Sequence, residues 1–578
     1  MSGNISHLQH FDTLTRRPKT RTQKEEERRS QKEKEEEQFV EPEIRLSRFL
    51  YIGKEYANYQ PGYWFAHNYF IAKNVPSIEE LADNEEKQLV PIELIIKAFD
   101  SNLVPHPETL VFALAVCCRQ NKSEKLRKAA YDNVTKICAS TQDFFLFIKF
   151  ASKLCREKEL NYHTQGWGQG LRKAINNWYL SKKPLDLAKC VTKYRSRYGW
   201  KHKDIVKMAH TSTNDPEKGV ILKYIICGIE NTRMALENQS ENPNINEILQ
   251  YIENVKNFKR CEDENEAASL LETNGYSLEH VPGHLLKSRK VWSALIPSMD
   301  TITLLNNLQR ISNLGLLESD ELAIENVIDQ LTNAELIAQS KIHPALIFIT
   351  LKNYKNSGKP LSYEKRKVQE TAKRPLSPPP SPNIKVINAL REAFNLSFAH
   401  QQPTKLRYLV TISMNRVMLN EPAWHNGNMT GAETGCLIAM ILLRCETDVT
   451  VATFKQHGLY TANVNNTQSH SEILKTLQEI PAAGVNMSKP LHWAMKQKTK
   501  YDVFINIVDQ VYEYSDESQK ALILYRNELN LPQTKLINCS MCCSSTYRKI
   551  NCDENILTIN GFDATVPIVI QAFSRSMF

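Results

Sequence analysis

The chain has 578 residues, of which 42% are hydrophobic and 24% are charged, and this composition is typical of globular domains. Its length suggests two to four domains of about 150 residues each. The formal net charge of +9 permits a polyanionic partner but does not require one. The longest apolar run, residues 110–118, is about half as long as a membrane-spanning helix, and residues 1–19 lack the apolar stretch of a signal peptide. We therefore expect an intracellular, cytoplasmic protein without a membrane partner, and we leave a nuclear pool open.

The first part of the chain is predicted to be a charged tail followed by a long run of helices. Residues 1–42 carry alternating charge blocks and few apolar residues, so we expect disorder there. From 43 to 362 apolar residues recur at helical spacing, and the connections are short. The predicted helices cover 107–118, 123–138, 142–155, 168–180, 244–258, 288–295, 303–311 and 323–338. Serial helices of this kind predict an α-solenoid of the HEAT class, although no fixed-period repeat is visible.

A Pro-rich linker, residues 363–383, separates these helices from a region of different pattern. Ser377 and Ser381 each precede a proline and could be phosphorylated, while a plain spacer is the alternative. From 384 to 578 strands alternate with helices, which predicts a parallel sheet covered by helices on both faces. The predicted strands are 407–412, 449–453, 502–508 and 534–538, and the predicted helices are 387–398, 433–444, 471–479, 488–495 and 518–529.

Positive charge is concentrated in the segment 191–210, which holds six Lys or Arg residues against one Asp. Lys193 and Arg197 are four residues apart, so we expect them to share one helix face, and Gly199–Trp200 to break that helix. In the next helix we expect a basic face and a buried face, formed respectively by Lys203, Lys207 and His210 and by Ile205, Val206, Met208 and Ala209. Two helix ends would then present basic groups that could grip RNA phosphates, with Trp and His near enough to touch bases. The alternative is a solvated Lys/Arg face on an ordinary helical hairpin.

No sequence motif indicates catalysis. The chain contains neither H-E-x-x-H nor G-x-S-x-G, and its 19 glycines form no phosphate-cradling loop. We therefore expect a noncatalytic protein without a cofactor, although a triad assembled in space cannot be recognised from sequence.

The cysteines do not suggest a disulfide framework, because their number, 13, is odd and they are scattered along the chain. A C-x-x-C core, Cys539 to Cys542, is followed by Cys543 and Cys552 and allows a zinc interpretation. The spacing to the fourth cysteine is short and no His pair follows, so free thiols in a loop are the favoured interpretation.

Several phrases of the sequence, in order, resemble the Ro (SS-A) ribonucleoprotein family, also called the TROVE-domain family. They are residues 46–50, 107–116, 167–179, 191–194, 199–200, 202–204, 284–288, 291–292, 342–344, 480–484 and 502–505. The resemblance runs from about residue 43 to the C-terminus, apart from the linker. It implies a ring of HEAT-like helical repeats, residues 43–362, and a von Willebrand factor A-like domain, residues 384–578.

The resemblance also implies an RNA-binding function. Family members bind small noncoding Y RNAs on the outer basic surface of the ring, and the single-stranded 3′ ends of misfolded small RNAs enter its central hole. The residues that match the family's Y RNA contacts are Lys193, Arg197 and His210. The further candidates are Arg195, Lys201, His202 and Lys203 as accessories, and Arg172, Lys173, Lys287 and Arg289 as weaker backbone contacts. For each of these alone, a surface cation without a role is an equal alternative, and Trp167, Trp178 and Trp292 are expected to be packing residues.

The chain departs from the family at the metal site of the A-like domain. The family's first loop reads Asp-x-Ser-x-Ser, which suits a hard divalent cation, but here Ser413, Asn415 and Val417 occupy those positions. The family's second-loop Thr falls on Val485, and only the third-loop Asp is kept, as Asp509. We therefore predict a degenerate site that binds no metal.

Together these features predict a monomeric, noncatalytic RNA-binding protein of small ribonucleoproteins. Its partners would be Y RNA-like and misfolded small RNAs, with RNA-processing proteins as further candidates, and its role would be RNA quality control. One rival is a protein-binding scaffold that has lost RNA binding. A hydrolase or nuclease is disfavoured, because the carboxylate cluster of two-metal chemistry is missing.

Overall fold

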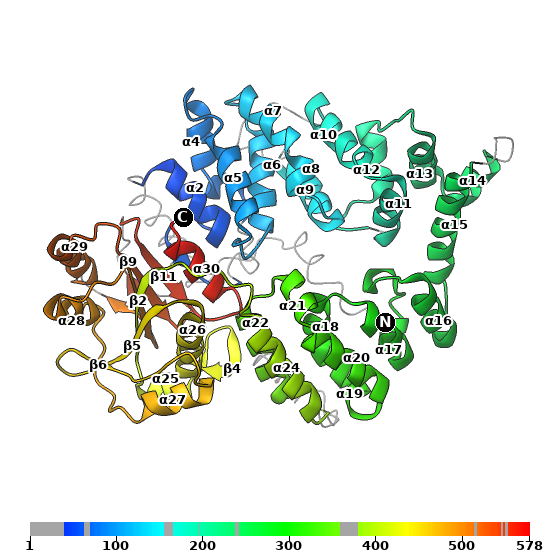
Figure 1. Ribbon diagram of the computed structural model, residues 1–578. Helices are drawn as coiled ribbons and strands as arrows, with labels where there is room; N and C mark the ends of the chain where they lie inside the picture. Colours follow the sequence, from blue (N-terminus) through cyan, green and yellow to red (C-terminus); the bar gives the residue numbers. More distant parts are fainter. Residues whose placement is uncertain are drawn as a thin grey trace, which may run out of the picture. The chain divides into compact units, whose positions relative to one another are not determined.

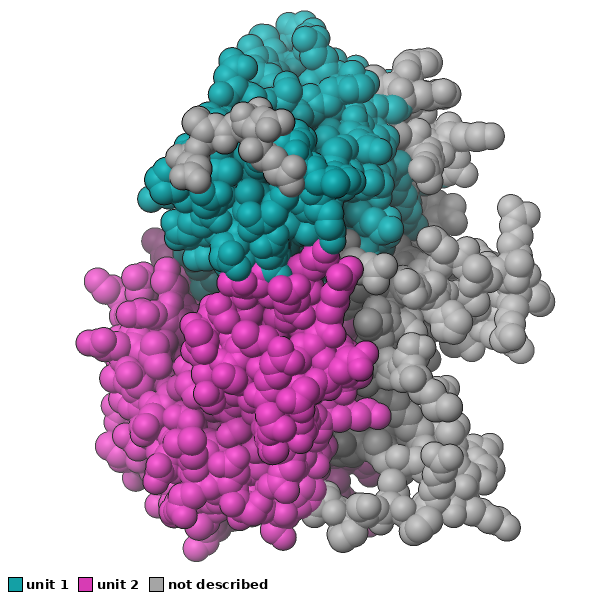
Figure 2. All heavy atoms as spheres, turned by 90° about the vertical axis from the view of Figure 1, so that its right-hand side faces the viewer, with its two compact units in different colours: residues 1–56, 68–253, 578 teal, residues 57–67, 254–577 magenta. Residues whose placement is uncertain are grey.

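The computed structural model describes residues 40–62, 70–154, 166–194, 196–236, 242–358, 380–513, 517–544, 547–548 and 553–578 (Figure 1). The chain divides into two compact units, coloured separately in Figure 2. Unit 1 takes its residues from 1–56, 68–253 and position 578, and unit 2 from 57–67 and 254–577. Most of the predicted tail and linker, including Ser377, lies outside the described residues. No described helix combines the length and apolar character needed to cross a membrane.

The described part of unit 1 is almost entirely helical. Its helices are α2 (Pro42–Ile52), η2 (Ala72–Asn74), α4 (Ser77–Asp83), α5 (Val90–Ser101), α6 (Glu108–Arg119), α7 (Glu124–Asp132), α8 (Val134–Ile137), α9 (Thr141–Leu154), α10 (Gln169–Leu180), α11 (Pro184–Lys193), α12 (His202–Ala209), α13 (Pro216–Cys227), α14 (Ile229–Met234) and the first part of α15 (Pro243–Phe258). Successive helices pack against one another, as α5 against α6 and α6 against α7. This arrangement confirms the predicted helical region.

Helix α6 forms the centre of unit 1, because it is apolar on every side. All of its residues except Glu108 are buried, and α2, α5, α7 and α9 surround it. Helix α7 begins at a conventional cap, where the Ser123 hydroxyl accepts a hydrogen bond from Leu126 N. The predicted helix 123–138 is interrupted at Asn133, which separates α7 from α8.

The first half of unit 2 continues the helical pattern. Its helices are the end of α15, α16 (Glu264–Asn274), η4 (Leu278–His280), η5 (Leu285–Lys287), α17 (Arg289–Leu295), η6 (Ile296–Ser298), α18 (Thr301–Asn313), α19 (Leu316–Ser319), α20 (Glu321–Thr332), α21 (Ala334–Ser340) and α22 (Pro344–Lys355). The predicted helix 323–338 is two helices, since the Asn333 side chain accepts from the N–H groups of Glu335 and Leu336 and so starts a new helix.

The second half of unit 2 is the predicted α/β region. Its helices are α24 (Ile384–Leu396), α25 (Arg416–Asn420), α26 (Gly431–Cys445), α27 (His470–Gln478), α28 (Lys489–Gln497), α29 (Glu517–Leu529) and α30 (Val566–Ser574). Its strands are β2 (Arg407–Ile412), β3 (Pro422–Ala423), β4 (Asn426–Thr430), β5 (Asp448–Phe454), β6 (Leu459–Thr461), β7 (Val503–Val508), β8 (Tyr512–Glu513), β9 (Lys535–Ser540), β10 (Tyr547–Arg548) and β11 (Ile556–Asn560). The main sheet has the order β1-β11-β9-β7-β2-β5-β6, where β1 is Asn58–Tyr59.

This sheet is parallel except for the pair β5–β6. Its two faces bury alternate residues of each strand. Leu409 of β2 belongs to a core that includes Leu491 of α28 and Leu522 of α29. Ile412 lies under α26, where a Cβ on Gly435 would come within 3.0 Å of its Cγ2. The predicted parallel sheet with covered faces is therefore confirmed.

The edge strand β1 (Asn58–Tyr59) comes from the beginning of the chain, which the sequence had assigned to the helical region. It pairs in parallel with β11, and Thr558 N donates to Ala57 O at 3.0 Å. Tyr59 is fully buried and its hydroxyl bonds to the hydroxyl of Thr565. The compact units therefore do not follow the predicted boundaries, since residues 57–62 belong to the unit that contains the sheet.

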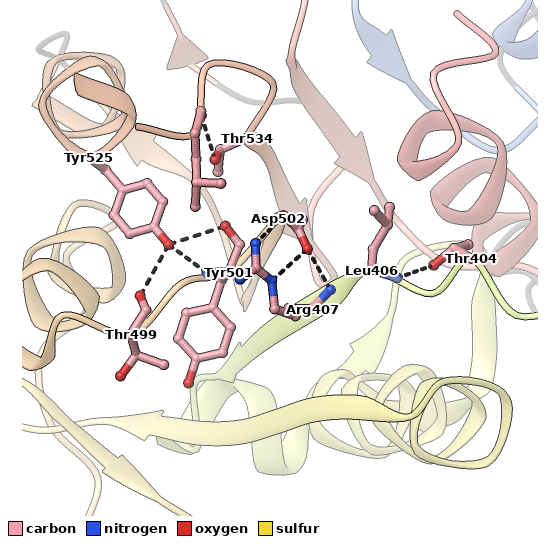
Figure 3. A network of polar contacts seen from close by, with 9 residues as sticks. Thr404, Leu406, Arg407, Thr499, Tyr501, Asp502, Tyr525 and Thr534 are labelled. Atoms are coloured by element: carbon pink, nitrogen blue, oxygen red, sulfur yellow. Dashed lines mark hydrogen bonds and ion pairs between the residues drawn. The ribbon is translucent and has the colours of Figure 1, made fainter. Parts of the chain in front are cut away.

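A polar network fixes the amino-terminal ends of the central strands (Figure 3). The guanidinium of Arg407 binds the Asp502 carboxylate through two hydrogen bonds of 2.9 and 2.7 Å. The Tyr525 hydroxyl accepts from Tyr501 N at 2.6 Å. Burial raises the pKa of Asp502, but the Arg407 hydrogen bonds outweigh it and leave that pKa below its ordinary value. These contacts hold β2 and β7 in register at the end opposite the loops that follow the strands.

Candidate nucleic-acid interface

The segment 191–210 forms the end of one helix, a tight turn and a second helix. Helix α11 ends at Lys193, and Arg197 and Trp200 then exchange two backbone hydrogen bonds of 2.9 Å. Tyr198 and Gly199 between them have φ values of 51° and 84°, as a tight two-residue turn requires. The prediction that Lys193 and Arg197 share a helix face is therefore wrong, because the helix ends before Arg197.

Lys193 instead shares its helix face with Lys189. The two residues are four apart within α11, and Lys189 is exposed while Lys193 is half-buried. Lys193 lies in the last turn of the helix, where the helix dipole favours a cation. Sequence reasoning missed Lys189, although its spacing from Lys193 would have shown it once the helix end had been placed correctly.

Arg197 is held by its neighbours rather than directed freely into solvent. Its guanidinium donates to the Gln142 side chain at 3.1 Å and lies 5.4 Å from the ring centres of both Tyr194 and Tyr198. Such stacking fixes the guanidinium plane. Arg197 therefore anchors the turn and carries its charge at a fixed position.

Helix α12 presents the predicted basic face. Lys203, Lys207 and His210 are exposed, whereas Ile205, Val206 and Ala209 are buried. Met208 was expected on the buried side but is 40% exposed, because its position falls on the same side as Lys207. Lys201 at the N-cap is exposed, and Arg195 lies outside the described residues.

His202 was predicted as an accessory RNA contact, and the structure contradicts this. It is only 5% exposed, its Nδ1 bonds to the Tyr179 hydroxyl at 2.7 Å, and the Phe145 ring packs on it edge to face. Burial lowers the pKa of His202 to about 3, so the imidazole is neutral. A buried neutral ring cannot contact RNA, and His202 is a core residue.

Helix α10 lies beside α12 and adds two exposed cations, Arg172 and Lys173. The hydroxyl of Thr211, just after α12, bonds to the Asn176 side chain of α10 at 2.6 Å. The opposite face of α10 buries Trp178, whose ring stacks on Phe144 with a centre distance of 3.8 Å. We call the exposed or half-buried cations of α10, α11 and α12 and of the α12 caps the basic surface; its members are Arg172, Lys173, Lys189, Lys193, Lys201, Lys203, Lys207 and His210.

The other two candidate tryptophans are buried, and of the two remaining candidate cations Arg289 has structural contacts. Trp292 is fully buried and donates to Leu286 O at 2.9 Å, and Trp167 is 9% exposed. In unit 2, Lys287 is exposed, and Arg289 donates to Gly315 O at 3.0 Å and to Ser319 Oγ at 2.6 Å. Arg289 therefore ties two helix ends together.

The loop after β2, where the family pattern implies a divalent cation, does not fit one. Asn415 caps α25 through Oδ1, and its Nδ2 donates to the Asp509 carboxylate at 2.8 Å. Val417 and Val485 offer no side-chain oxygen, and Ser413 is buried. One carboxylate that already accepts an amide hydrogen bond is a poor ligand set for Mg²⁺. Within the described ranges, no three His, Cys, Asp or Glu side chains are grouped to hold a metal.

The described cysteines near this loop, Cys539, Cys542 and Cys543, form no disulfide. Cys539 is fully buried in strand β9 and not in the expected loop, and burial raises its pKa. Burial also raises the pKa of Cys542 to about 11. Cys552 lies outside the described residues.

These features define a class of protein with a helical-repeat region bearing a basic surface, followed by an α/β domain with an incomplete metal site. The TROVE domain profile matches residues 30–406, and the Ro60 vWA domain profile matches residues 407–574. The first match covers more than half of the chain, so the chain belongs to the TROVE-domain family. The resemblance stated from sequence is thereby confirmed.

Two relatives are similar over nearly the whole chain. An RNA-binding protein RO60 of Caenorhabditis elegans is 22% identical, covering 92% of this chain and 88% of the relative. An RNA-binding protein RO60 of Deinococcus radiodurans is 23% identical, covering 93% of each. The crystal structure of the Deinococcus radiodurans RO (RSR) protein matches with a TM-score of 0.76 at 22% identity, over 93% of this chain and 100% of that one. The structural likeness supports the fold.

Proposed function

We propose that this protein binds small RNA through the basic surface and performs no catalysis. The observation that carries the proposal is the set of cations on α10, α11 and α12, two of which, α10 and α12, pack against each other, in a TROVE-domain fold. Lys and Arg side chains bind phosphates and supply most of the affinity of such complexes. The two relatives are named RNA-binding proteins, which supports the same function here.

The finer proposal concerns the RNA. We infer Y RNA-like RNAs on the basic surface and the free 3′ ends of misfolded small RNAs in the central hole of a ring of helical repeats, in RNA quality control in the cytoplasm. A rigid surface that tracks phosphates recognises a folded RNA by shape, and a narrow hole admits a single strand but not a duplex. The incomplete metal loop of the A-like domain supports a function that does not require a metal ion in that loop.

The test is a gel-shift titration with a stem-containing small RNA that carries a single-stranded 3′ tail. We expect Lys193→Gln/Lys203→Gln to weaken binding about tenfold or more, since each lost charge-assisted contact contributes about 1.5–3 kcal/mol. The control is Lys97→Gln/Lys125→Gln, which removes the same charge from exposed positions of α5 and α7. An RNA without the tail tests the second site.

The results discriminate between RNA binding and the alternative function as a scaffold. Equal weakening by both double variants would indicate attraction by net charge alone and contradict a defined surface. If the wild-type protein binds RNA no better than an unrelated protein of equal charge, the scaffold function replaces the proposal.

A further inference from the structure

Unit 1 contains a pocket that shares one residue, Lys173, with the basic surface. It has a volume of about 440 Å³ and lies between the end of α6, helix α7 and the start of α10. This volume falls within the range of about 300–1,000 Å³ that small-ligand sites occupy. Four cationic side chains and two carboxylates, Glu124 and Asp132, line it, so the lining carries a net positive charge; the cations are Arg119, Arg127, Lys128 and Lys173.

Arg119 is the buried cation of this pocket. It is 3% exposed; its Nε donates to Ala151 O at 3.0 Å and its Nη1 to Gly166 O at 3.2 Å. Its Nη2 is buried and has no hydrogen-bond partner among the described residues. Arg119 forms no ion pair with the described residues, and a buried guanidinium without a countercharge is costly. An anionic oxygen in the pocket would satisfy the remaining donor.

The start of α10 supplies a second set of donors to the same pocket. Gly168, Gln169 and Gly170 line it, and the N-cap residue Gly168 has no side chain to satisfy the first N–H groups. The first turn of α10 contains no acidic residue. The unsatisfied N–H groups and the helix dipole together favour an anion at this end.

Gly170 lets the helix start approach an aromatic ring. A Cβ at this position would lie 2.8 Å from Cε2 of Tyr131, closer than such contacts allow. Tyr131 of α7 therefore forms one wall of the pocket beside the N–H groups of α10. In proteins that bind single-stranded nucleic acids, aromatic side chains serve as stacking platforms for bases.

We propose that this pocket binds one nucleotide, with its phosphate on Arg119 Nη2 and the first turn of α10 and its base beside Tyr131. The nucleotide can be a residue of a bound RNA or a free nucleoside monophosphate. The first alternative extends the proposed function by a subsite that holds a single unpaired residue, since a base-paired nucleotide could not turn its base into a pocket.

The test is calorimetric titration of the full chain with adenosine 5′-monophosphate, inorganic phosphate and adenosine. We expect the monophosphate to bind at least about tenfold more tightly than adenosine, because the phosphate makes the charge-assisted contacts. Lys128→Gln should weaken monophosphate binding severalfold. Lys125→Gln removes the same charge from the same helix outside the pocket and should leave binding unchanged. Arg119→Lys keeps the charge but removes Nη2 and should weaken binding further, with its melting temperature checked because the residue is buried.

Each outcome decides the proposal. Equal affinity for adenosine and its monophosphate, or equal weakening by Lys125→Gln and Lys128→Gln, overturns it. If Lys128→Gln also weakens a single-stranded oligoribonucleotide, the occupant is RNA; if only the monophosphate is affected, the occupant is a free nucleotide. If Lys193→Gln/Lys203→Gln loses RNA binding but the wild type binds no monophosphate, the proposal for this pocket fails and the proposed function stands. If the wild type binds the monophosphate but no RNA, the proposed function fails and the proposal for this pocket stands.

Discussion

Two histidines eight residues apart have opposite environments. His210 is exposed at the end of α12, where it adopts the left-handed conformation with a φ of 52°, and it is available to a ligand. His202 is enclosed by Tyr179 and Phe145. Both histidines belong to one basic segment of the sequence, and they differ because the His202 side chain is buried.

The enclosed imidazole of His202 predicts a loss of stability in acid. Its pKa is about 3 in the folded protein and about 6.5 in an unfolded chain. The stabilising contribution is therefore complete above pH 6.5 and is lost as the pH falls from 6.5 toward 3, by about 1.4 kcal/mol per pH unit. His202→Asn, which keeps a group able to bond Tyr179, should have a flatter dependence of unfolding free energy on pH between 7 and 5.

Denaturant unfolding of both proteins at several pH values measures this difference. The variant is expected to be less stable than the wild type at pH 7, because it loses packing against Phe145. Parallel pH profiles for the two proteins would show that His202 does not titrate on unfolding in this range.

At the scale of elements, the loop between β2 and α25 lacks the family's metal-ligating side chains, but its backbone is still held by neighbouring elements. Strand β2 is held by β5 and β7 on either side, and α25 is capped by Asn415. Capping and strand pairing therefore supply the contacts that position the loop backbone.

This arrangement predicts that metal binding can be restored by side chains alone. The variant Ser413→Asp/Asn415→Ser/Val417→Ser/Val485→Thr recreates the family's oxygen ligands around Asp509. It should bind Mg²⁺ or Mn²⁺ saturably in calorimetry, while the wild type should show no saturable binding, since a hard cation needs several oxygen ligands.

A control carries the same substitutions with Asp509→Asn, which removes the remaining carboxylate and should abolish the gained binding. Saturable binding by the wild-type protein would refute the prediction that its site is degenerate.

At the scale of the whole molecule, the beginning of the chain completes the sheet formed by its end. Strand β1 covers the edge of β11, and an uncovered edge would expose unpaired backbone groups. Tyr59 fixes this strand by burying its ring and bonding to Thr565.

We predict that Tyr59→Ala destabilises the unit that contains the sheet by about 3–5 kcal/mol, the usual cost of removing a buried aromatic ring. Tyr59→Phe loses only the hydrogen bond and should cost about 1 kcal/mol. Hydrogen exchange should show lost protection in β11 and β9, with α6 and α9 protected as in the wild type. Equal loss in α6 would indicate that the two units unfold as one.

Charge distribution predicts the salt dependence of RNA binding. The logarithm of the association constant should fall linearly with the logarithm of salt concentration, and each basic-surface lysine replaced by Gln should reduce the slope by about 0.7–0.9 if it contacts one phosphate. Lys97→Gln should leave the slope unchanged. A slope near zero for the wild type would contradict phosphate binding as the source of affinity.

The sequence by itself determined the succession of elements, because helical and strand periodicity are local properties of the chain. It placed β2 at its observed bounds, the helices that it predicted within a few residues, and the basic residues of α12 on the correct face. It also determined that the metal loop lacks ligands, since that follows from residue types alone. The helix ends at Lys193 and Asn333 were not predicted from the sequence. Side-chain caps and turns can end a helix where the apolar spacing alone would continue it.

The tertiary structure alone decided the features that depend on residues far apart in the chain. The burial of His202 requires Phe145 and Tyr179 from other helices, and the position of Arg197 requires Gln142. The pairing of β1 with β11 joins residues about 500 positions apart, and no periodicity in a two-residue strand could indicate it. Burial and pairing depend on which surfaces meet after folding, so composition and spacing cannot specify them.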